Sequence, residues 1–276
     1  MPSKARVVKD LVNSPIVVVP CAIGGFDPSS GAGITADLQT FQNQGFEGVS
    51  AVTSLTVQSY KRVVWIEPVG SRVLRETLNL LREETGIGGV KIGMLGTGEL
   101  VGVVAEFLRD AGFGRERVVL DPVIRASSGA ALLDPAGVRR LTEELLPLAG
   151  WVTPNVDEAG ALLGRGPASR EDVPEMARLI QDLGAPRSGR GARPGRGLNV
   201  VITGGHLDPP DDFLCTAMGE EVWIRGTRAE VRSRHGTHGT GCVFASALLC
   251  RLLAGDAPVD AVRGAKAAVV RRLETP

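Results

Sequence analysis

The chain has 276 residues, 43% of them hydrophobic, and its 31 basic side chains balance its 31 acidic ones. This length and composition suit one large α/β domain, and the lack of a basic stripe argues against nucleic acid or an anionic membrane as a partner. No apolar run has the length of a membrane span, and residues 1–14 are polar and mixed in charge, unlike a signal peptide. We expect those residues to form a flexible extension.

The cysteine pattern indicates a reducing compartment. The four cysteines are scattered without a C-x-x-C pair, at positions 21, 215, 242 and 250. Such spacing predicts a cytoplasmic protein with neither a disulfide framework nor a zinc site.

Strand and helix patterns alternate along the chain. Apolar runs predict strands at 16–23, 48–56, 89–93, 117–121, 150–153 and 198–203. Helical patterns cover 33–44, 72–85, 98–111, 135–148, 155–163, 171–183, 240–254 and 258–273. Helix starts are indicated by Ser71, by Thr97 and by Asp134 before Pro135. This alternation predicts a mostly parallel sheet with helices on both faces.

Two segments depart from the alternation. Three short strands are expected within 213–232, at 213–216, 221–224 and 228–231, as a small antiparallel edge. Residues 184–197 are rich in glycine, proline and arginine, which predicts a mobile surface loop between a helix and a strand. Residues 15–276 otherwise read as a single domain.

A glycine-rich loop follows the first strand. Residues 24–33 read GGFDPSSGAG, and apolar side chains at Ile34, Leu38 and Phe41 then fit a helix. The loop lacks both the Gly-Lys-Ser/Thr of a P-loop and the G-x-G-x-x-G dinucleotide spacing. A polar turn with one carboxylate, Asp27, at the carboxyl end of a strand suits a small polar ligand in an open α/β sheet.

A second glycine-rich turn opens a helix near the C-terminus. Residues 235–242 read HGTHGTGC and lead into an apolar helical run. Backbone N–H groups at a helix start are unpaired and favour an anion, and glycine at 239 and 241 lets a phosphate lie close. Cys242 falls where the helix dipole lowers a thiol pKa and favours the thiolate. The alternative is a loop that caps a buried helix, with Cys242 as a small core residue.

Seven segments resemble, in order, the hydroxymethylpyrimidine (phosphate) kinases of thiamine biosynthesis, which belong to the ribokinase-like superfamily. They are 24–33 with 36–40, then 54–59, 90–96, 119–123, 153–159, 203–206 and 238–242. The resemblance spans about residues 16 to 272. It implies an α/β, ribokinase-like three-layer sandwich, and an ATP- and Mg²⁺-dependent phosphotransferase. We also expect a homodimer.

The resemblance assigns catalysis to the second turn. The backbone amides of Gly239, Thr240, Gly241 and Cys242 would stabilise charge on the transferring phosphoryl group. Many sugar kinases of the superfamily carry Asp where this chain has Cys242, whereas the pyrimidine kinases carry Cys. The thiolate would accept the proton of the acceptor hydroxyl, or the thiol would position that hydroxyl without acting as a base.

The metal and nucleotide residues are also implied by the resemblance. In the superfamily, a Glu such as Glu158 orders water around Mg²⁺, and an Asn such as Asn155 lies near phosphate. Asp121, after an apolar strand, suits a second acidic group near the metal. The structural alternatives are a capping box made by Asn155 and Glu158, and a turn residue at Asp121. Thr203 and Gly205 belong to the segment expected at the ATP phosphates.

The chain departs from its relatives at the nucleotide end. Many relatives carry Lys in place of Thr203, and Lys-Gly-Gly where Ser127-Ser128-Gly129 stands here. Each change removes a positive charge that would face ATP.

Three residues are candidates for the pyrimidine pocket. Gln58 has both a donor and an acceptor to meet an aminopyrimidine edge, and Asp27 accepts from its amino group or hydroxyl. Met94 offers an adaptable apolar contact to the ring. Gln58 as an exposed loop residue and Met94 as plain core are the alternatives.

Two other functions remain open from the residues. Pyridoxal is a hydroxymethyl-bearing ring of similar size, so a pyridoxal kinase of the same fold is one of them. The missing lysines suggest a non-catalytic pyrimidine sensor, although retention of Cys242, Asn155 and Glu158 argues against it.

Overall fold

The computed structural model describes residues 18–126, 129–166, 168–185, 197–205 and 207–275. The expected N-terminal extension and residues 186–196 of the expected mobile loop lie outside these ranges, as do Ser127 and Ser128. Among the described residues, no helix combines the length and apolar character needed to cross a bilayer.

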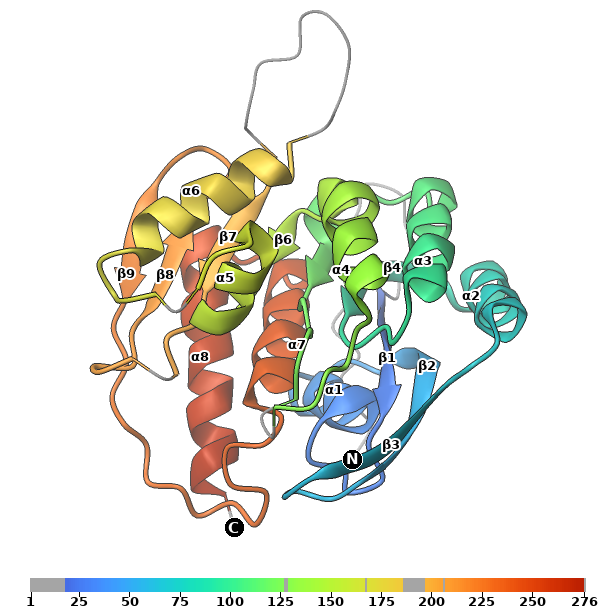
Figure 1. The fold of residues 1–276 in the computed structure, drawn as a ribbon, viewed down its shortest axis with the longest axis horizontal. Coiled ribbons are helices and arrows are strands. Elements are labelled where there is room, and N and C mark those ends of the chain that lie inside the picture. The colour runs from blue at the N-terminus through green and yellow to red at the C-terminus, as the bar shows by residue number, and fades with distance from the viewer. Residues whose placement is uncertain (1–17, 127–128, 167, 186–196, 206, 276) are drawn as a thin grey trace, which may run out of the picture.

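A nine-stranded sheet runs through the centre of the molecule (Figure 1). Its strands lie in the order β3-β2-β1-β4-β5-β6-β7-β8-β9. Their bounds are β1 Val19–Phe26, β2 Val49–Gln58, β3 Val63–Pro68, β4 Ile87–Ile92, β5 Val118–Leu120, β6 Trp151–Val152, β7 Asn199–Ile202, β8 Asp212–Cys215 and β9 Glu221–Ile224. The six strands β1, β2 and β4 to β7 pair in parallel, while β3 at one edge and β8 and β9 at the other are antiparallel.

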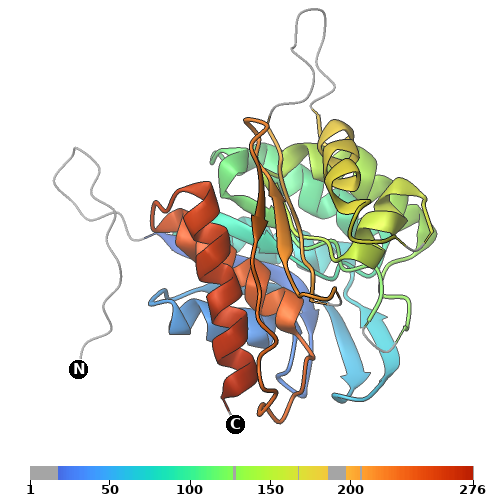
Figure 2. The same cartoon turned by 90° about the vertical axis from the view of Figure 1, so that its left-hand side faces the viewer.

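Helices cover both faces of this sheet, as the alternation predicts. One apolar core packs α1 Gly33–Asn43, α7 Thr240–Leu253 and α8 Pro258–Glu274 against one face. The other core packs α2 Ser71–Thr85, α3 Gly98–Asp110, α4 Pro135–Arg140, α5 Val156–Leu163 and α6 Val173–Leu183 against the opposite face. Figure 2 shows α8 on one side of the strands and the α5–α6 region on the other. The three-layer sandwich is confirmed.

Two predicted elements are wrong in part. The expected helix 135–148 is α-helical only in α4, and continues as a π-helical segment at Leu141–Leu145 and a 3-10 turn at Leu146–Leu148. Pro147 has no N–H to continue the α-helical hydrogen bonds, which explains the break. The expected edge strand at 228–231 has no strand structure, so the C-terminal antiparallel edge contains β8 and β9 alone among the described residues.

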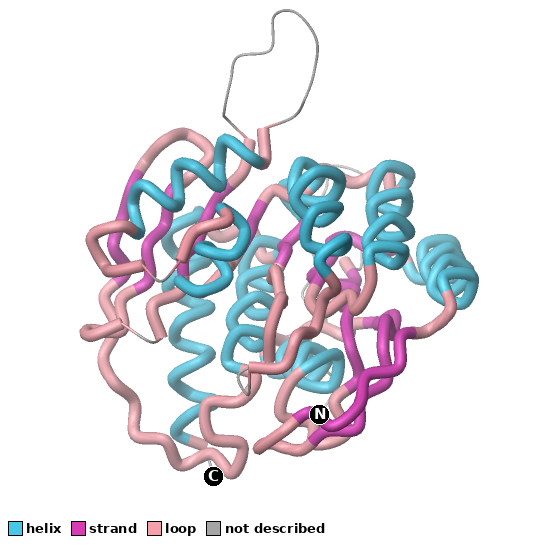
Figure 3. The backbone as a smooth tube through the Cα atoms, in the orientation of Figure 1, coloured by secondary structure: helices cyan, strands magenta, loops and turns pink. Residues whose placement is uncertain are grey.

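One hairpin was not expected. Strand β2 continues to Gln58 and turns into β3, which pairs with it antiparallel. Figure 3 shows this hairpin as the strand pair at the lower right edge. Its outer strand is largely exposed, with Val64 and Trp65 each 61% exposed.

Helix starts confirm two of the three predicted caps. Thr97 accepts a hydrogen bond from Leu100 N–H, and Asp134 accepts one from Gly137 N–H with Pro135 in the first turn. For α2 the cap is Gly70, and Ser71 is already the first helical residue. These caps fix α3 and α4 beside the sheet without entering the site.

Candidate active site

The candidate residues converge on the edge where the parallel strands end. Asp27 follows β1, Gln58 ends β2, Met94 lies just beyond β4, Asp121 follows β5 and Thr203 follows β7. Asn155 comes three residues after β6 and forms an isolated parallel bridge with Thr203. Parallel strands place their carboxyl ends on one edge, where open α/β sheets bind ligands.

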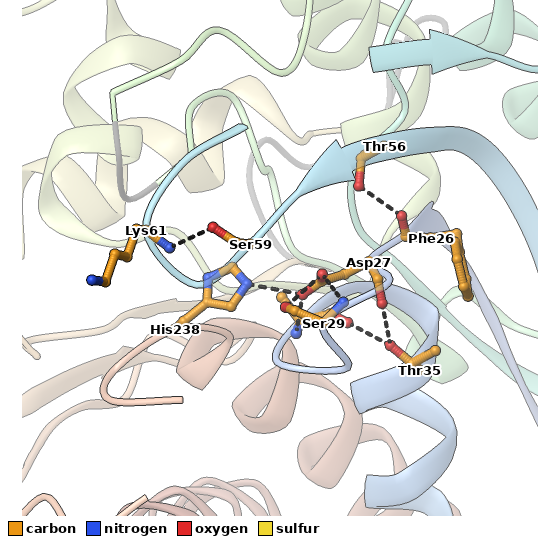
Figure 4. Close-up of polar contacts among 9 residues, drawn as sticks. Phe26, Asp27, Ser29, Thr35, Thr56, Ser59, Lys61 and His238 are labelled. Carbon is orange, nitrogen blue, oxygen red and sulfur yellow. Dashed lines mark hydrogen bonds and ion pairs between the residues drawn. The ribbon is translucent and has the colours of Figure 1, made fainter. Parts of the chain in front are cut away.

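Asp27 organises the loop that follows β1. Its carboxylate accepts hydrogen bonds from Ser29 N–H and Oγ, at 2.8 and 2.7 Å, and from Ala32 N–H at 2.8 Å. It also pairs with Nε2 of His238 at 2.9 Å, a contact from the second glycine-rich turn (Figure 4). Burial acts to raise the Asp27 pKa, but the bonds from His238, Ser29 and Ala32 outweigh it and hold the pKa well below its usual range.

His238 was missed as a site residue by the sequence reasoning, although it lies inside the quoted turn. Its bond to Asp27 joins the two glycine-rich segments into one site. In this arrangement all the contacts of the Asp27 carboxylate are with protein donors, and its side chain is 1% exposed. Its role toward substrate therefore stays a prediction.

The second turn opens α7 as expected. Gly239 is the cap residue, with φ of 79°, and the helix begins at Thr240. The N–H of Val243 donates to the Gly239 carbonyl, whereas the N–H groups of Gly241 and Cys242 have no backbone acceptor among the described residues. Two donors thus remain at the positive end of a 14-residue helix, an arrangement that binds anions.

The two glycines of this turn serve different purposes. A Cβ on Gly239 would overlap the carbonyl of Gly31, so this glycine allows the turn to pack against the Asp27 loop. A Cβ on Gly241 would meet only Asp121, at 3.8 and 4.0 Å from its carboxylate oxygens. Of these two glycines, only Gly241 leaves open space, on the side where Asp121 lies. The expected close approach of a phosphate is therefore a prediction for Gly241 and not for Gly239.

The expected thiolate at Cys242 is not what the structure supports. Burial raises the pKa of its thiol to about 12. Lys91 and a backbone hydrogen bond from Gly33 lower it, and the carboxylates of Asp37 and Asp121 raise it further. The helix start alone suggests a low pKa, but desolvation of the charged form dominates, so these surroundings favour the neutral thiol over the thiolate.

Asp121 and Glu158 are two acidic groups near enough for the charge of Asp121 to act on Glu158. Burial raises the pKa of Asp121 to about 6, although Lys91 opposes the shift. Burial and the nearby Asp121 charge raise the pKa of Glu158 to about 8. Two carboxyl groups that resist ionisation side by side are suited to share a cation.

The donor set fits Mg²⁺ better than a metal held by protein alone. No group of three or more His, Cys, Asp or Glu side chains with metal-binding geometry occurs among the described residues. Mg²⁺ is usually held by one or two carboxylates, with substrate phosphates and water completing its shell. Asp121 and Glu158 would supply the protein part of such a shell.

The alternative structural role of Asn155 and Glu158 is confirmed. Asn155 Oδ1 accepts from Glu158 N–H at 2.9 Å, and Glu158 Oε2 accepts from Asn155 N–H at 3.0 Å. This capping box starts α5. It fixes both side chains at the carboxyl edge, and so is compatible with a role toward phosphate and metal.

The segment after β7 presents backbone at the same edge. Thr203 N–H donates to the Pro154 carbonyl at 2.9 Å, which ties it to the strand end before Asn155. Gly205 is exposed, and a Cβ there would meet nothing. Close packing requires glycine at position 204, because a Cβ there would overlap the Asp211 carbonyl. The Gly204 N–H donates to Asp212 Oδ1 at 2.9 Å.

Gln58 and Met94 both lie half-buried at this edge. Met94 packs on Gly25 of β1, and its carbonyl accepts from Thr53 Oγ1 at 2.6 Å. Met94 is thus beside the loop that carries Asp27. Gln58 ends β2 next to the hairpin turn, where its partner across the pair is Val63.

The sequence reasoning also missed a buried ion pair beneath the turn. Lys91 of β4 and Asp37 of α1 are 1% and 0% exposed, with Nζ 2.9 Å from Oδ1. Each is a single charge in an otherwise apolar sequence pattern. Lys91 lies within an apolar strand, and Asp37 lies on the helix face that carries Ile34 and Phe41. A lone charge in such a pattern is the feature that would have identified them.

Comparison with known proteins agrees with this architecture. The family model described as phosphomethylpyrimidine kinase matches residues 27–276. The hydroxymethylpyrimidine/phosphomethylpyrimidine kinase of Haemophilus influenzae is 37% identical over 259 residues, covering 92% of this chain and 90% of that protein. The crystal structure of phosphomethylpyrimidine kinase from Clostridium difficile superposes with a TM-score of 0.75 at 28% identity, covering 92% of this chain and 98% of the other.

A pyridoxal kinase is structurally as similar. The Staphylococcus aureus enzyme in complex with ADP gives a TM-score of 0.79 at 30% identity, covering 93% of this chain and 88% of the other. The fold and these comparisons therefore define a small-molecule kinase of the ribokinase-like class. Within that class, the chain belongs to the phosphomethylpyrimidine kinase family.

Proposed function

We propose that this chain transfers the γ-phosphoryl group of ATP to 4-amino-5-hydroxymethyl-2-methylpyrimidine and then to its monophosphate, as a step of thiamine biosynthesis. The observation that carries the proposal is the start of α7, where the N–H groups of Gly241 and Cys242 have no backbone acceptor among the described residues and Gly241 lies beside Asp121. Family membership supplies the class of substrate.

The backbone of the turn is the main catalytic device in this proposal. The amides of Gly241 and Cys242 would stabilise charge on the transferring phosphoryl oxygens, and Thr240 lies beside them at the helix start. They belong to a packed helix and cost no reorganisation when the charge develops. This preorganisation is the largest single contribution that such sites make to the rate.

The neutral Cys242 thiol would position the acceptor hydroxyl rather than remove its proton. Phosphoryl transfer has a loose transition state that depends mainly on alignment and electrostatic stabilisation. A thiol with a raised pKa is a poor base near neutral pH, but donates or accepts a weak hydrogen bond. Of the two roles considered for Cys242, positioning is the one that its surroundings favour.

Asp121 and Glu158 would hold Mg²⁺, in part through water, with Asn155, Thr203 and Gly205 lining the phosphate end. When bound, Mg²⁺ neutralises charge on the phosphates of ATP. The raised pKa values of both carboxyls fit a site that becomes fully ionised only when a cation arrives. The neutral Thr203 leaves more of the charge compensation to the metal and the helix start.

The pyrimidine would bind between the Asp27 loop and the ends of β2 and β4. The Gln58 amide would pair with the ring nitrogen and amino group, while Met94 would contact the ring face. Asp27 would accept from the amino group or hydroxyl, or act through the loop that it organises. These assignments depend on the shared strand-end position of the three residues.

Pyridoxal is the competing acceptor, because the Staphylococcus aureus pyridoxal kinase superposes on this chain so well. A direct test measures kcat/KM for hydroxymethylpyrimidine, its phosphate and pyridoxal with purified protein, ATP and Mg²⁺. We expect both pyrimidines to be phosphorylated with higher kcat/KM than pyridoxal. Faster turnover of pyridoxal would refute the proposed substrate, and no turnover of any acceptor would refute the kinase activity.

We further propose that the protein is a cytoplasmic homodimer. The β2–β3 hairpin exposes an apolar strip at the sheet edge: Leu55 at 52%, Val57 at 57%, and Val64 and Trp65 at 61% each. An exposed edge strand with such side chains favours association with a second copy. Four free cysteines, three of them buried, suit a reducing compartment. Light scattering on the protein and on a Trp65→Glu variant would test the dimer.

A further inference from the structure

A buried charged cluster lies directly beneath the proposed phosphoryl-transfer site. The Lys91 ammonium is 2.9 and 3.0 Å from the two carboxylate oxygens of Asp37, and Ser246 Oγ donates to Asp37 Oδ1 at 2.8 Å. These side chains come from β4, α1 and α7. All three are buried.

The same ammonium reaches the proposed metal-binding side. Lys91 Nζ lies 3.9 Å from Oδ2 of Asp121, which is itself only 5% exposed. Asp121 is the residue that a Cβ on Gly241 would face. The Asp121 carboxylate therefore lies between the Lys91 ammonium and the start of α7, where we propose that the anion binds.

The backbone is shaped to leave room for this ammonium. A Cβ on Gly93 would lie 2.9 Å from Lys91 Nζ, closer than a carbon atom can approach it without a shift. Burial disfavours the charged form of Lys91, but Asp37, Cys242 and Asp121 outweigh burial, so its pKa is raised and the ammonium keeps its charge. A charge that needs this much support is expensive to retain for packing alone, because apolar residues of similar volume pack as well or better.

We propose that Lys91 is a positioning residue for phosphoryl transfer, which holds Asp121 under the start of α7 and offsets its charge as phosphate oxygens approach. Asp37, itself held by Ser246, binds the ammonium, and Asp121 is the second carboxylate within 4 Å of it. Without it, Asp121 would present uncompensated negative charge to an anionic substrate whenever the metal is incompletely bound. The inference rests on the proposed kinase activity, which supplies the assay.

The test compares two variants that are both neutral at position 37. Asp37→Asn keeps the ammonium beside Asp121, and Lys91→Met with Asp37→Asn removes it at similar volume. In Asp37→Asn, Asp121 remains as a carboxylate neighbour of Lys91, and the amide oxygen can accept the hydrogen bond that the Asp37 carboxylate accepts. In the double variant neither charge is left, whereas Lys91→Met alone would leave the Asp37 charge buried without its partner. Far-ultraviolet circular dichroism and cooperative thermal unfolding establish that each variant is folded.

We expect the double variant to have a kcat at least about tenfold below that of Asp37→Asn, because only Asp37→Asn keeps the ammonium beside Asp121. The KM for the pyrimidine should change by less than about threefold in both, because the Lys91 ammonium contacts Asp37 and Asp121, neither of which is a candidate pocket residue. Equal kcat in the two variants, whether high or low, would overturn the proposal, since the ammonium would then have no effect of its own.

A second neutral pair guards against loss of the fold. If the Met and Asn combination does not fold, Lys91→Gln with Asp37→Asn offers two amides that hydrogen-bond to each other in the same space. Its kcat relative to Asp37→Asn decides the proposal by the same criterion. An inactive parent protein would instead count against the kinase assignment, so the two failures are distinguishable.

Discussion

Replacing Gly241 by alanine separates the stability of the α7 turn from its function. Gly241 lies inside the first turn of the helix, and its φ is not in the left-handed region. The new methyl group would make ordinary van der Waals contact with Asp121, at 3.8 and 4.0 Å from its oxygens. A Gly→Ala change at a compatible helical position stabilises a protein by about 0.4–1 kcal/mol, so we expect a thermal midpoint about 1–4 °C higher.

The same methyl group fills the space where a phosphate must approach the two unpaired amides. Loss of one such donor costs about 10²–10³ in kcat, or about 2.7–4 kcal/mol of transition-state stabilisation, and we expect a loss of that size here. The assay couples ADP release to a spectrophotometric readout at saturating ATP and pyrimidine. Thermal unfolding is measured on the same preparation.

Two other glycines serve as controls. At Gly239, with φ of 79°, alanine would be strained and would overlap the Gly31 carbonyl, so Gly239→Ala should lose both stability and activity. Gly70→Ala, at the cap of α2 where a Cβ meets nothing, should change neither property much. A Gly241→Ala protein with parent-like kcat would show that phosphate does not bind at this turn.

Three further outcomes test the pair of carboxyls, the thiol and the pocket. Because the pKa of Glu158 is raised from 4.5 to about 8, the folded protein holds a proton that the unfolded chain releases, so stability should fall as pH rises from about 4.5 to about 8. Thermal unfolding without ligands should show this fall in stability with pH, and Glu158→Gln should flatten it. Mg²⁺ should stabilise the parent more at pH 9 than at pH 6. The same pH dependence in the parent and in Glu158→Gln would contradict the raised pKa of Glu158. Cys242→Ala should lower kcat about tenfold, and iodoacetamide should modify Cys242 of the parent slowly at pH 8. Fast alkylation of Cys242, together with a loss of about 10²–10⁴ in the kcat of Cys242→Ala, would instead identify a thiolate base. Gln58→Leu should weaken calorimetric binding of hydroxymethylpyrimidine by about one to two orders of magnitude, at about 1–3 kcal/mol per unpaired polar group, and unchanged affinity would place Gln58 outside the pocket.

The parts of the fold that could be predicted are those with a local pattern. Parallel strands are buried on both faces and appear as apolar runs, and the residue just after each run is at the ligand-binding edge. Asp27 and Asp121 were identified in this way, whereas Thr203 was named through the family resemblance; each of the three directly follows its strand. The capping box of Asn155 and Glu158 was equally readable because its contacts span only three residues.

The parts that could not be predicted depend on partners distant in sequence. Strand β3 is mostly exposed and shows no buried face, so its pairing with β2 left no pattern to detect. The Lys91–Asp37 pair joins residues 54 positions apart. The pKa of Cys242 was misjudged for the same reason: the helix start is visible in the sequence, whereas the burial that dominates the thiol comes from neighbours on other elements.

The contact between Gly31 and Gly239 has a consequence for how this enzyme can change its substrate. At that point the loop that carries Asp27 and the turn that starts α7 touch backbone to backbone. With the acceptor and the phosphate bound as proposed, this main-chain contact would set the distance between the loop and the turn, and no rotamer could adjust it. A new acceptor ring has to be accommodated at the far end of the pocket, near Gln58 and Met94, so selection for altered specificity should collect substitutions there and leave both glycines unchanged.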